Sequence, residues 1–578
     1  MKKIFPASLF LIFFGFYAYL SFPALSSFRD AGDFSAAALS FGVPHPPGYP
    51  SYVLLAKFFQ PFLSGNPAYR ANIVSAFCGA GVVLLVFLSL SRFCGLAASL
   101  LGALFIGFFS PHMAQSGLSE IYGLNALFAA LLLWGAFFIP ALSPSARTRG
   151  WVGLGLLGGM GMGNHQTLLA VGPSVLLLLW RERGSLVLHP RFVRVVLAAA
   201  GLGLAVYLLL PLRAAAEAVQ VWGEPDTWNG FWAMFTRADY GTGTLSSLYS
   251  TASPAMGLAF WFRVWGRRWG AWAVVLQLAA AVWLFRKENR KVWGAPVLLL
   301  WIFSGPVFAL LARLQPAEHS EAVLSPALVL PGLAAALGMG FFLEALLKRR
   351  RFLAVLGLLA VTLFVVGRGV PAVLSQRQRW NLVSMDYGRN LFRTVPPASV
   401  LLMISDTSVF SAAYSQAAGA RSDVRLLVDA SPSWRWRQYR RRFPDLFSAG
   451  QEDGGMELLR RQSGRVGLFT EGIQPKFVES LHPYGLAAAV EWPKRTPACL
   501  DRMEESLPLW GFYVRRLPSA AVLRADYYTR TLLKTVSSGG FNAGLLLHEG
   551  GRRESSLAFY ARSLFWNPER ILRWAEIF

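Results

Sequence analysis

The sequence of 578 residues is poor in charge and in cysteine. Charged residues make up 15% of it, against about 25% in ordinary soluble proteins, whereas 54% of its residues are hydrophobic. This composition excludes a soluble globular enzyme and a disordered chain. The three cysteines, Cys78, Cys94 and Cys499, are too few for a disulfide framework. The chain is therefore not a disulfide-rich secreted module.

Acidic residues are scarce relative to basic ones. The 31 Asp and Glu residues against 55 Lys and Arg residues give a net charge of +24. In a soluble protein this excess would suggest a nucleic-acid partner. Here much of it lies in short segments between apolar runs, where positive charge determines membrane topology. The remainder is spread over the C-terminal part, so we expect no nucleic-acid partner.

Leucine-rich apolar runs recur through the first two-thirds of the chain, as membrane-spanning helices require. The first, residues 4–25, follows Lys2 and Lys3 and lacks a clear signal-peptide cleavage site, so we interpret it as a signal anchor rather than a cleaved leader. Ten further spans are predicted: residues 73–91, 95–110, 121–139, 151–162, 167–179, 192–212, 271–284, 292–312, 322–346 and 352–370.

Basic residues alternate with these spans. Those at 92, 147–149, 181–183, 286–291 and 348–351 all fall on the side of Lys2 and Lys3. The positive-inside rule then predicts eleven spans in the cytoplasmic (inner) membrane, with the N-terminus in the cytoplasm and the C-terminal part outside. Residues 257–272, arginines on an aromatic background, predict an interfacial amphipathic helix on the outer face.

The predicted fold class is an α-helical polytopic membrane protein followed by a C-terminal extracytoplasmic α/β domain. The transmembrane domain covers residues 1–372 and carries two long outer loops, 26–71 and 213–256. A strand–helix–strand pattern predicts the α/β domain over residues 373–539. Residues 540–578 form a predicted helical pair that resembles one tetratricopeptide-like unit.

Two carboxylates, Asp30 and Asp33, lie immediately outside the first span. A proline-rich turn containing His45 and Tyr49 follows them. One reading is structural, with either aspartate capping a short helix over residues 34–41. The other is functional, with a general base at the membrane surface and a second carboxylate or His45 to orient it. Local chemistry leaves both readings open.

The pattern Asp30-x-Gly-Asp33-Phe34, followed by His-Pro-Pro-Gly-Tyr-Pro over residues 45–50, resembles the GT-C membrane glycosyltransferases. More narrowly, it is similar to a protein O-mannosyltransferase-like subfamily, long catalogued as a membrane domain of unknown function. Two departures are that the subfamily usually has Glu at the position of Asp33 and commonly has His at the position of Gln166. The resemblance continues, in order, over residues 119–125, 161–167, 207–213 and 222–241, and returns around Asp406 and residues 421–424.

The resemblance implies a GT-C-like fold and an inverting transfer of a hexose, with mannose as the best guess. The donor would be a polyprenyl-phosphate hexose in the membrane lipid, and the acceptor a hydroxyl of a protein Ser/Thr or a surface glycan at the outer face. Asp30 is then the expected base, with Asp33 as a helper, and Glu120 joins them or merely caps a span. Arg213 and Arg237 are the expected phosphate partners, because guanidinium groups match phosphate oxygens, or else interfacial residues. Secondary substrate-binding residues are His45, Tyr49 and His165, the last of which is alternatively a packed turn residue.

Two other classes of function are open from the sequence. A membrane transporter or lipid flippase would have repeat symmetry and ionisable groups at mid-membrane, which we do not detect. A structural or sensory protein would leave the loop carboxylates inert. No metal-ligand spacing is present, but a divalent metal would be possible if Asp30, Asp33 and Glu120 converged.

Overall fold

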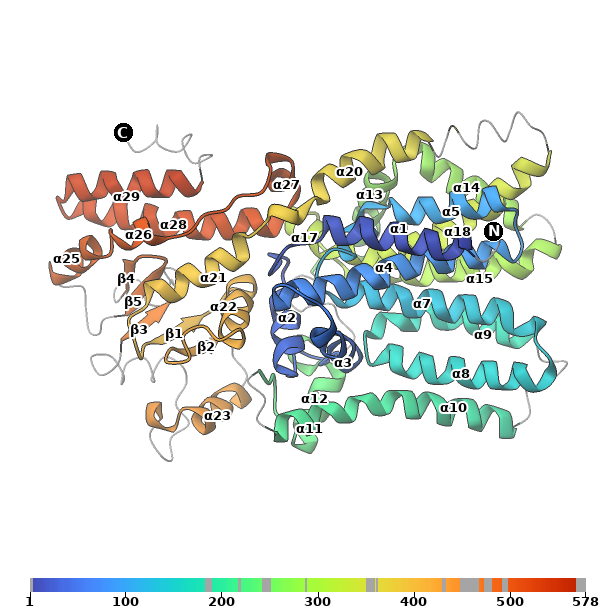
Figure 1. Cartoon of the computed structure of the whole chain (residues 1–578), viewed down its shortest axis with the longest axis horizontal. Coiled ribbons are helices and arrows are strands. Elements are labelled where there is room, and N and C mark those ends of the chain that lie inside the picture. The colour runs from blue at the N-terminus through green and yellow to red at the C-terminus, as the bar shows by residue number, and fades with distance from the viewer. Residues whose placement is uncertain are drawn as a thin grey trace.

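The structure is a computed structural model. It describes residues 4–181, 190–216, 220–241, 251–285, 288–349, 359, 362–428, 433–447, 467–471, 481–490 and 497–567. Two parts lie end to end in Figure 1: a bundle of long helices from the first two-thirds of the chain, and a smaller part that contains a β-sheet.

Each of the first ten predicted spans contains a helix of the bundle. Within the described residues, five helical stretches are long and apolar enough to cross a membrane, among them Pro67–Ser91 and Glu318–Lys348. About half of the predicted eleventh span, residues 352–370, lies outside the described residues, so the count of eleven stays a prediction. The helices are α1 (Ile4–Leu20), α4 (Pro67–Ser91), α5 (Leu96–Gly107), α7 (Ile121–Phe138), α8 (Pro144–Met162), α9 (Gly172–Arg181), α10 (Pro190–Leu204), α14 (Ala271–Phe285), α15 (Glu288–Ser304), α16 (Pro306–Ala312), α17 (Glu318–Leu324) and α18 (Val329–Arg349).

The predicted amphipathic helix is present as α13 (Pro254–Trp269), and three of its tryptophans lie inside the protein. Trp261, Trp265 and Trp269 are fully buried. The Trp269 ring stacks on Phe109 of the bundle at 4.4 Å between centroids. Burial of three large aromatic side chains anchors the helix on the bundle. Its position at the membrane interface stays a prediction.

The two long loops join each other at the end of the bundle nearest the sheet. The first forms α2 (Ala31–Ser40) and α3 (Pro50–Phe59); the second forms α11 (Leu209–Ala215), α12 (Trp228–Thr236) and the 3-10 turn η5 (Ala238–Tyr240). The amide of Val43 donates to the carbonyl of Gln220 at 2.8 Å, and Trp222 donates back to Val43 at 2.9 Å. This short parallel bridge fixes the second loop against the first.

The C-terminal part has a five-stranded sheet in the order β2-β1-β3-β5-β4. Strands β2 (Arg425–Val428), β1 (Val400–Met403) and β3 (Leu468–Thr470) are parallel. Strand β5 (Ala487–Val490) pairs antiparallel with both β3 and β4 (Leu481–Tyr484). Assignment of this part as a separate extracytoplasmic domain stays a prediction, as does the tetratricopeptide-like unit. The main helices around it are α21 (Val383–Thr394), α22 (Asp406–Ala417), α23 (Ser433–Arg442), α28 (Tyr527–Glu549) and α29 (Arg553–Trp566).

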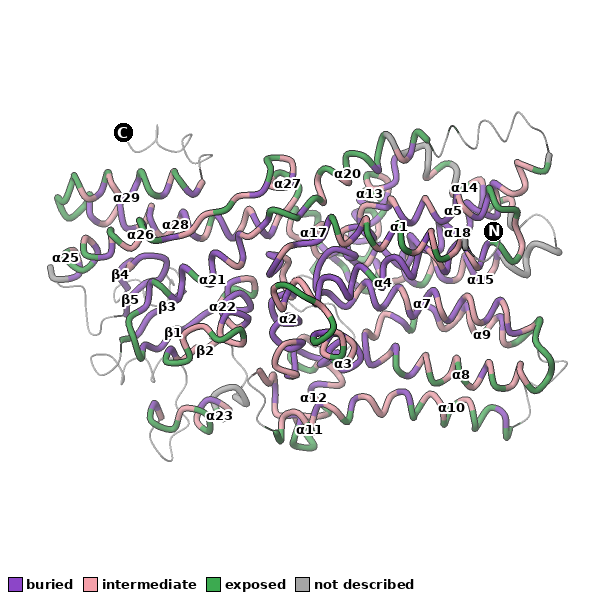
Figure 2. The backbone as a smooth tube through the Cα atoms, viewed as in Figure 1, coloured by how far each residue is buried: buried purple, intermediate pink, exposed green. Residues whose placement is uncertain are grey.

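Helix α22 packs directly on α2, which joins the sheet-containing part to the first outer loop (Figure 1). Gly32 permits this approach, because a Cβ there would lie 2.6 Å from the carbonyl oxygen of Phe410. The Tyr414 hydroxyl donates to Oδ1 of Asn66 at 2.6 Å. Buried residues continue from α2 into α22 in Figure 2, so the C-terminal part covers the α2 segment of the first outer loop.

Candidate active site

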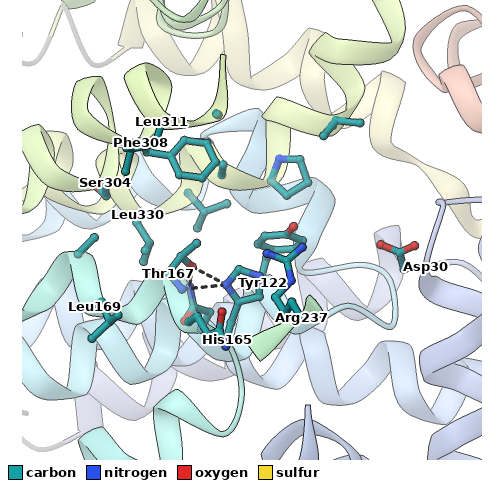
Figure 3. Close-up of a pocket in the computed structure, with 18 of the residues that line it drawn as sticks. Asp30, Tyr122, His165, Thr167, Leu169, Arg237, Ser304, Phe308, Leu311 and Leu330 are labelled. Carbon is teal, nitrogen blue, oxygen red and sulfur yellow. Dashed lines mark hydrogen bonds between the residues drawn. The ribbon is translucent and has the colours of Figure 1, made fainter. Parts of the chain in front are cut away.

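A cavity of about 630 Å³ lies where the outer loops meet the bundle. One end is polar and the other apolar. Figure 3 shows Asp30 at the polar end, Arg237, Tyr122 and His165 in the middle, and Leu330, Phe308 and Leu311 at the apolar end. Of the eight predicted site residues, five line this cavity: Asp30, His45, Tyr49, His165 and Arg237.

Asp30 is the single carboxylate among the described residues that line the cavity. It occupies the position before α2 but makes no capping hydrogen bond, so the capping alternative is wrong for this residue. Instead its Oδ1 accepts a hydrogen bond from Nε of Arg29 at 3.0 Å. Burial opposes ionisation, but the charges of Arg29, His45 and Arg237 outweigh it and hold the pKa of Asp30 below its usual value. The carboxylate is thus ionised at neutral pH.

Asp33 lies behind the cavity wall and is fully buried. Its Oδ2 accepts from the amide of His45 at 2.9 Å and lies 2.7 Å from Nδ1 of the same residue. Its Oδ1 accepts from the side-chain amide of Gln220. Because both oxygens are engaged, Asp33 orients His45 rather than facing a substrate; it caps nothing, since it lies inside the first turn of α2.

His45 and Tyr49 continue this chain to the cavity. Nε2 of His45 is 3.1 Å from the Tyr49 hydroxyl and 4.0 Å from Oδ2 of Asp30. The His45 ring also stacks on Phe410 of α22 at 6.2 Å between centroids. The imidazole is therefore held on one side by Asp33 and presents its other nitrogen to the base candidate and a tyrosine.

Glu120 is buried beside Asp30 but does not line the cavity. It precedes α7 without capping it, and neither of its oxygens makes a hydrogen bond of normal geometry. Burial, reinforced by the negative charge of Asp30, raises the pKa of Glu120 well above its usual value, and the nearby amide of Ile121 offsets this only weakly. Two neighbouring carboxyl groups therefore hold different protonation states, Asp30 ionised and Glu120 neutral.

This raised pKa predicts a pH-dependent effect of Glu120→Gln on stability. In the wild type, the stabilisation from a protonated Glu120 is complete below the usual glutamate pKa of about 4.3 and is lost as pH rises through the raised folded-state value. Gln cannot ionise. We expect the thermal midpoint of E120Q in detergent to exceed that of the wild type at pH 7–8, with the gap closing towards pH 4. The exposed variant Glu505→Gln is the control; equal midpoints at all pH values would refute the raised pKa.

His165 and Arg237 lie side by side at the middle of the cavity (Figure 3). His165 Nδ1 lies 2.6 Å from the hydroxyl of Thr167 and accepts the amide of the same residue, so the turn role expected as an alternative is present. Burial and the charge of Arg237 lower the pKa of His165 to about 3, and the ring is neutral. The side-chain amide of Gln166 donates to the carbonyl of Phe235 at 2.8 Å and so ties this turn to α12.

Arg237 and Arg213 differ in placement although both were expected to bind phosphate. Arg237 ends α12 with a left-handed backbone (φ 56°) and its guanidinium lies 5.6 Å from the centre of the Tyr240 ring, at the cavity wall. Arg213 does not line the cavity. Its Nε donates to the carbonyl of Phe41 at 2.7 Å and its guanidinium covers the Phe41 ring at 4.7 Å. Arg213 is thus placed to hold the end of α2.

Several cavity residues were not singled out from the sequence. Arg29 was given no role from the sequence, although its position beside Asp30 was a usable signal. Tyr240 and Tyr122 lie inside quoted motifs in the same way. Tyr528 comes from α28, almost 500 residues away from the first loop, and packs on Phe28 at 4.9 Å. No sequence signal pointed to it.

Asp30, Asp33 and Glu120 do not form a metal-binding cluster. Over the part of the chain that the structure describes, no group of three or more His, Cys, Asp or Glu residues has the arrangement of a metal site. Asp30 instead accepts a hydrogen bond from Arg29, Asp33 contacts His45, and Glu120 is buried.

The apolar end of the cavity is formed by residues from three segments of the bundle. These are the 3-10 turn η3 (Gln166–Val171), the single stretch formed by α15 and α16, and the stretch from α17 through the 3-10 turn η6 (Ser325–Leu328) to the start of α18. Leu169 and Leu311 on its edge are 66% and 63% exposed in the isolated protein. Large apolar side chains exposed on a membrane bundle face lipid. The cavity therefore connects the polar outer loops with the surrounding hydrocarbon.

The architecture is that of the GT-C fold. Over 85% of the chain it matches the crystal structure of ArnT from Cupriavidus metallidurans bound to undecaprenyl phosphate, with a TM-score of 0.50, 11% sequence identity and 97% coverage of that chain. The chain is thus an integral membrane protein with this fold.

Sequence comparison narrows the resemblance. The family model described as the protein O-mannosyl-transferase TMEM260 N-terminal domain matches residues 30–187. Mouse protein O-mannosyl-transferase TMEM260 is 28% identical over 442 residues, which cover 70% of this chain and 60% of the mouse protein. The Dictyostelium discoideum protein of the same name is 26% identical over 266 residues, which cover 42% of this chain and 32% of that protein. The match thus spans less than two thirds of either relative, and the resemblance to the protein O-mannosyltransferase-like GT-C proteins is confirmed.

Proposed function

We propose that this protein is an inverting glycosyltransferase that moves a hexose from a polyprenyl-phosphate carrier to an acceptor hydroxyl. The observation that carries the proposal is the cavity itself, in which one ionised carboxylate and two arginines adjoin an apolar channel open to lipid. Mannose is the proposed sugar, because the relatives are named O-mannosyl-transferases. The acceptor is a protein Ser/Thr or a surface glycan.

The two ends of the cavity suit the two halves of such a donor. An isoprenoid chain is pure hydrocarbon and gains by lying along Leu169, Phe308 and Leu311. Its phosphate would then meet Arg237 at the middle of the cavity, where a guanidinium and a neutral His165 are available. ArnT, with the same fold, was crystallised with undecaprenyl phosphate, which supports a lipid-linked donor here.

The reaction follows from these positions as a single displacement. The acceptor oxygen attacks the anomeric carbon and forms the new glycosidic bond, while the carbon–oxygen bond to phosphate breaks and its electron pair stays on the phosphate. Asp30 takes the acceptor proton, and Arg237 stabilises the negative charge that grows on the leaving phosphate. Attack opposite to the leaving group inverts the anomeric centre. His45 is positioned by Asp33 to hold Asp30 and Tyr49.

The membrane arrangement belongs to the same proposal. We place the protein in the cytoplasmic (inner) membrane with its N-terminus in the cytoplasm, and the sheet-containing part outside. In Figure 1 the N-terminal end of α1, the end of α9 and the start of α10 lie at the end of the bundle away from the sheet, and basic residues concentrate in the sequence next to these ends. The positive-inside rule assigns that end to the cytoplasm.

Mass spectrometry of envelope glycoproteins and glycans tests the function most directly. Cells lacking the protein are compared with cells complemented by the wild type. Loss of a hexose from defined acceptors, restored by the wild type, supports the proposal and identifies the acceptor. An unchanged glycan profile in the cells lacking the protein would contradict it, and altered uptake of a substrate would favour a transporter.

If the apolar end of the cavity holds the isoprenoid chain, Ala327→Phe should raise the donor KM by an amount that depends on the length of that chain. Ala327 lines the apolar end, so a phenyl group there shortens the space for the isoprenoid. We expect KM for a long-chain donor to rise about tenfold, equivalent to about 1.4 kcal/mol, with little change for a short-chain analogue. Donor kinetics in nanodiscs measure this. Ala198→Phe on the exposed face of α10 is the control, and an equal rise for both donors would count against the channel.

A further inference from the structure

The C-terminal part places a charged residue, Asp406, next to Arg29 at the catalytic end of the cavity, although Asp406 does not line the cavity itself. Oδ2 of Asp406, the first residue of α22, lies 3.9 Å from Nε of Arg29, which itself donates to Asp30 at 3.0 Å. A guanidinium has five N–H donors, more than one carboxylate oxygen can accept. Arg29 therefore stands between a carboxylate of the membrane part and one of the C-terminal part.

Asp406 is presented rigidly. It follows β1, the central strand of the parallel group, and the turn between them is fixed by Glu471 at the end of β3. Oε2 of the buried Glu471 accepts the amides of Ile404 and Ser405 at 3.1 and 2.9 Å. Because α22 also packs on α2 through Gly32 and Phe410, the distance between Asp406 and the first loop is set by two rigid contacts.

We propose that Asp406 is a positioning residue that shares the Arg29 guanidinium with Asp30, so that Asp30 keeps the basicity needed to take the acceptor proton. This rests on the proposed function. If Asp30 alone neutralised Arg29, its carboxylate would be a weaker base. Seating of the C-terminal part on the first loop is thereby required for full activity, and the catalytic site is complete only when both parts are in contact.

Removal of the Asp406 charge should lower the pKa of Asp30. Loss of a nearby negative charge and a stronger pairing with Arg29 both favour the ionised form of Asp30, so its pKa falls. The acid side of the pH–rate profile then moves to lower pH, by about half a unit, while the maximal rate falls because a weaker base accepts the proton. The charged and titratable groups around Asp30 are Arg29, His45, Tyr49, Glu120, Tyr122, Arg237, Tyr240, Asp406 and Tyr528.

Asp406→Asn tests the proposal against Asp445→Asn. Both side chains are exposed in the C-terminal part, at 61% and 55%, but Asp445 pairs with Arg425 outside the cavity. Using the acceptor found by mass spectrometry, we expect D406N to lower kcat about twofold to threefold, as a base weakened by about half a pKa unit requires, and to shift the acid limb down. D406E should restore the activity in part. The proposal would be overturned if D406N had the same kcat and the same acid limb of the pH–rate profile as D445N. It would also be overturned if D406N had a lower kcat with an unshifted acid limb.

Hydrogen exchange gives a second readout that needs no transfer reaction. Release of Arg29 from Asp406 should speed exchange of amides in the segment from residue 28 to residue 34 in D406N but not in D445N. Unchanged exchange in both variants would overturn the positioning role even if the protein proved to have another activity. Absence of transfer by the wild type, in contrast, would refute the proposed function alone.

Discussion

Asp30→Asn is expected to reduce hexose transfer by a factor of about 10² to 10⁴ while leaving the amount of folded protein unchanged. Asn is isosteric, and its remaining oxygen still accepts a hydrogen bond from Arg29. The amide loses the negative charge of the carboxylate and with it the ability to take a proton from the acceptor. Since Asp30 is the single carboxylate among the described cavity-lining residues, no neighbour replaces it. Glycan mass spectrometry of complemented cells and donor kinetics in nanodiscs measure the loss.

Asp33→Asn is the informative comparison for that variant. Asp33 accepts from two donors of His45 and from Gln220, all in a buried environment, so an amide there turns its NH2 group towards at least one donor. Leaving such a group unsatisfied costs about 1–3 kcal/mol. D33N should therefore lower the amount of folded protein, whereas D30N should lower the rate of hexose transfer at an unchanged amount of folded protein. Normal product from D30N at normal protein level would remove Asp30 as the base.

The opposite protonation of Asp30 and Glu120 explains how two carboxyl groups coexist at this site. Arg29 and Arg237 stabilise the charge on Asp30, whereas Glu120 has burial and no strong donor. A neutral Glu120 avoids a second negative charge beside the base. Glu120 is thus better described as a neutral neighbour of the base than as a second base.

The motifs of the first 250 residues predicted most of the site because they follow the outer ends of successive helices. Asp30 and His45 lie in one loop and were paired from local chemistry, whereas His165 lies far along the chain and was joined to them only by the resemblance to GT-C proteins. The membrane face they share follows from alternating basic connections. The sheet strands were predictable from short apolar runs, as at Val400–Met403.

Contacts made by packing between distant parts were not predictable. Nothing local in the sequence indicates that Asp406 and Tyr528 face Arg29, because this depends on the docking of α22 against α2. Burial was equally hidden for the tryptophans of α13, because it depends on residues of the bundle such as Phe109 that pack against them. Arg213 and Arg237 likewise look alike in sequence, and only the fold separates them.

Because Arg237 lines the cavity and Arg213 does not, substitutions of the two arginines should differ strongly in their effect on donor binding. Arg237→Met is expected to raise KM for the lipid-phosphate donor about 100-fold, equivalent to about 2.7 kcal/mol, because a charge-assisted hydrogen bond to phosphate is lost. Its influence on Asp30 adds a shift of the acid limb of the pH–rate profile to higher pH, since removal of a nearby positive charge raises the pKa of that base. Arg213→Met is the matched control: its guanidinium holds Phe41 at the end of α2, so the variant should melt at a lower temperature with an unchanged donor KM. Kinetics with purified donor and thermal denaturation of both variants separate the two roles. A donor KM raised by R213M and unaffected by R237M would reverse the assignment and move the phosphate to the far side of α2.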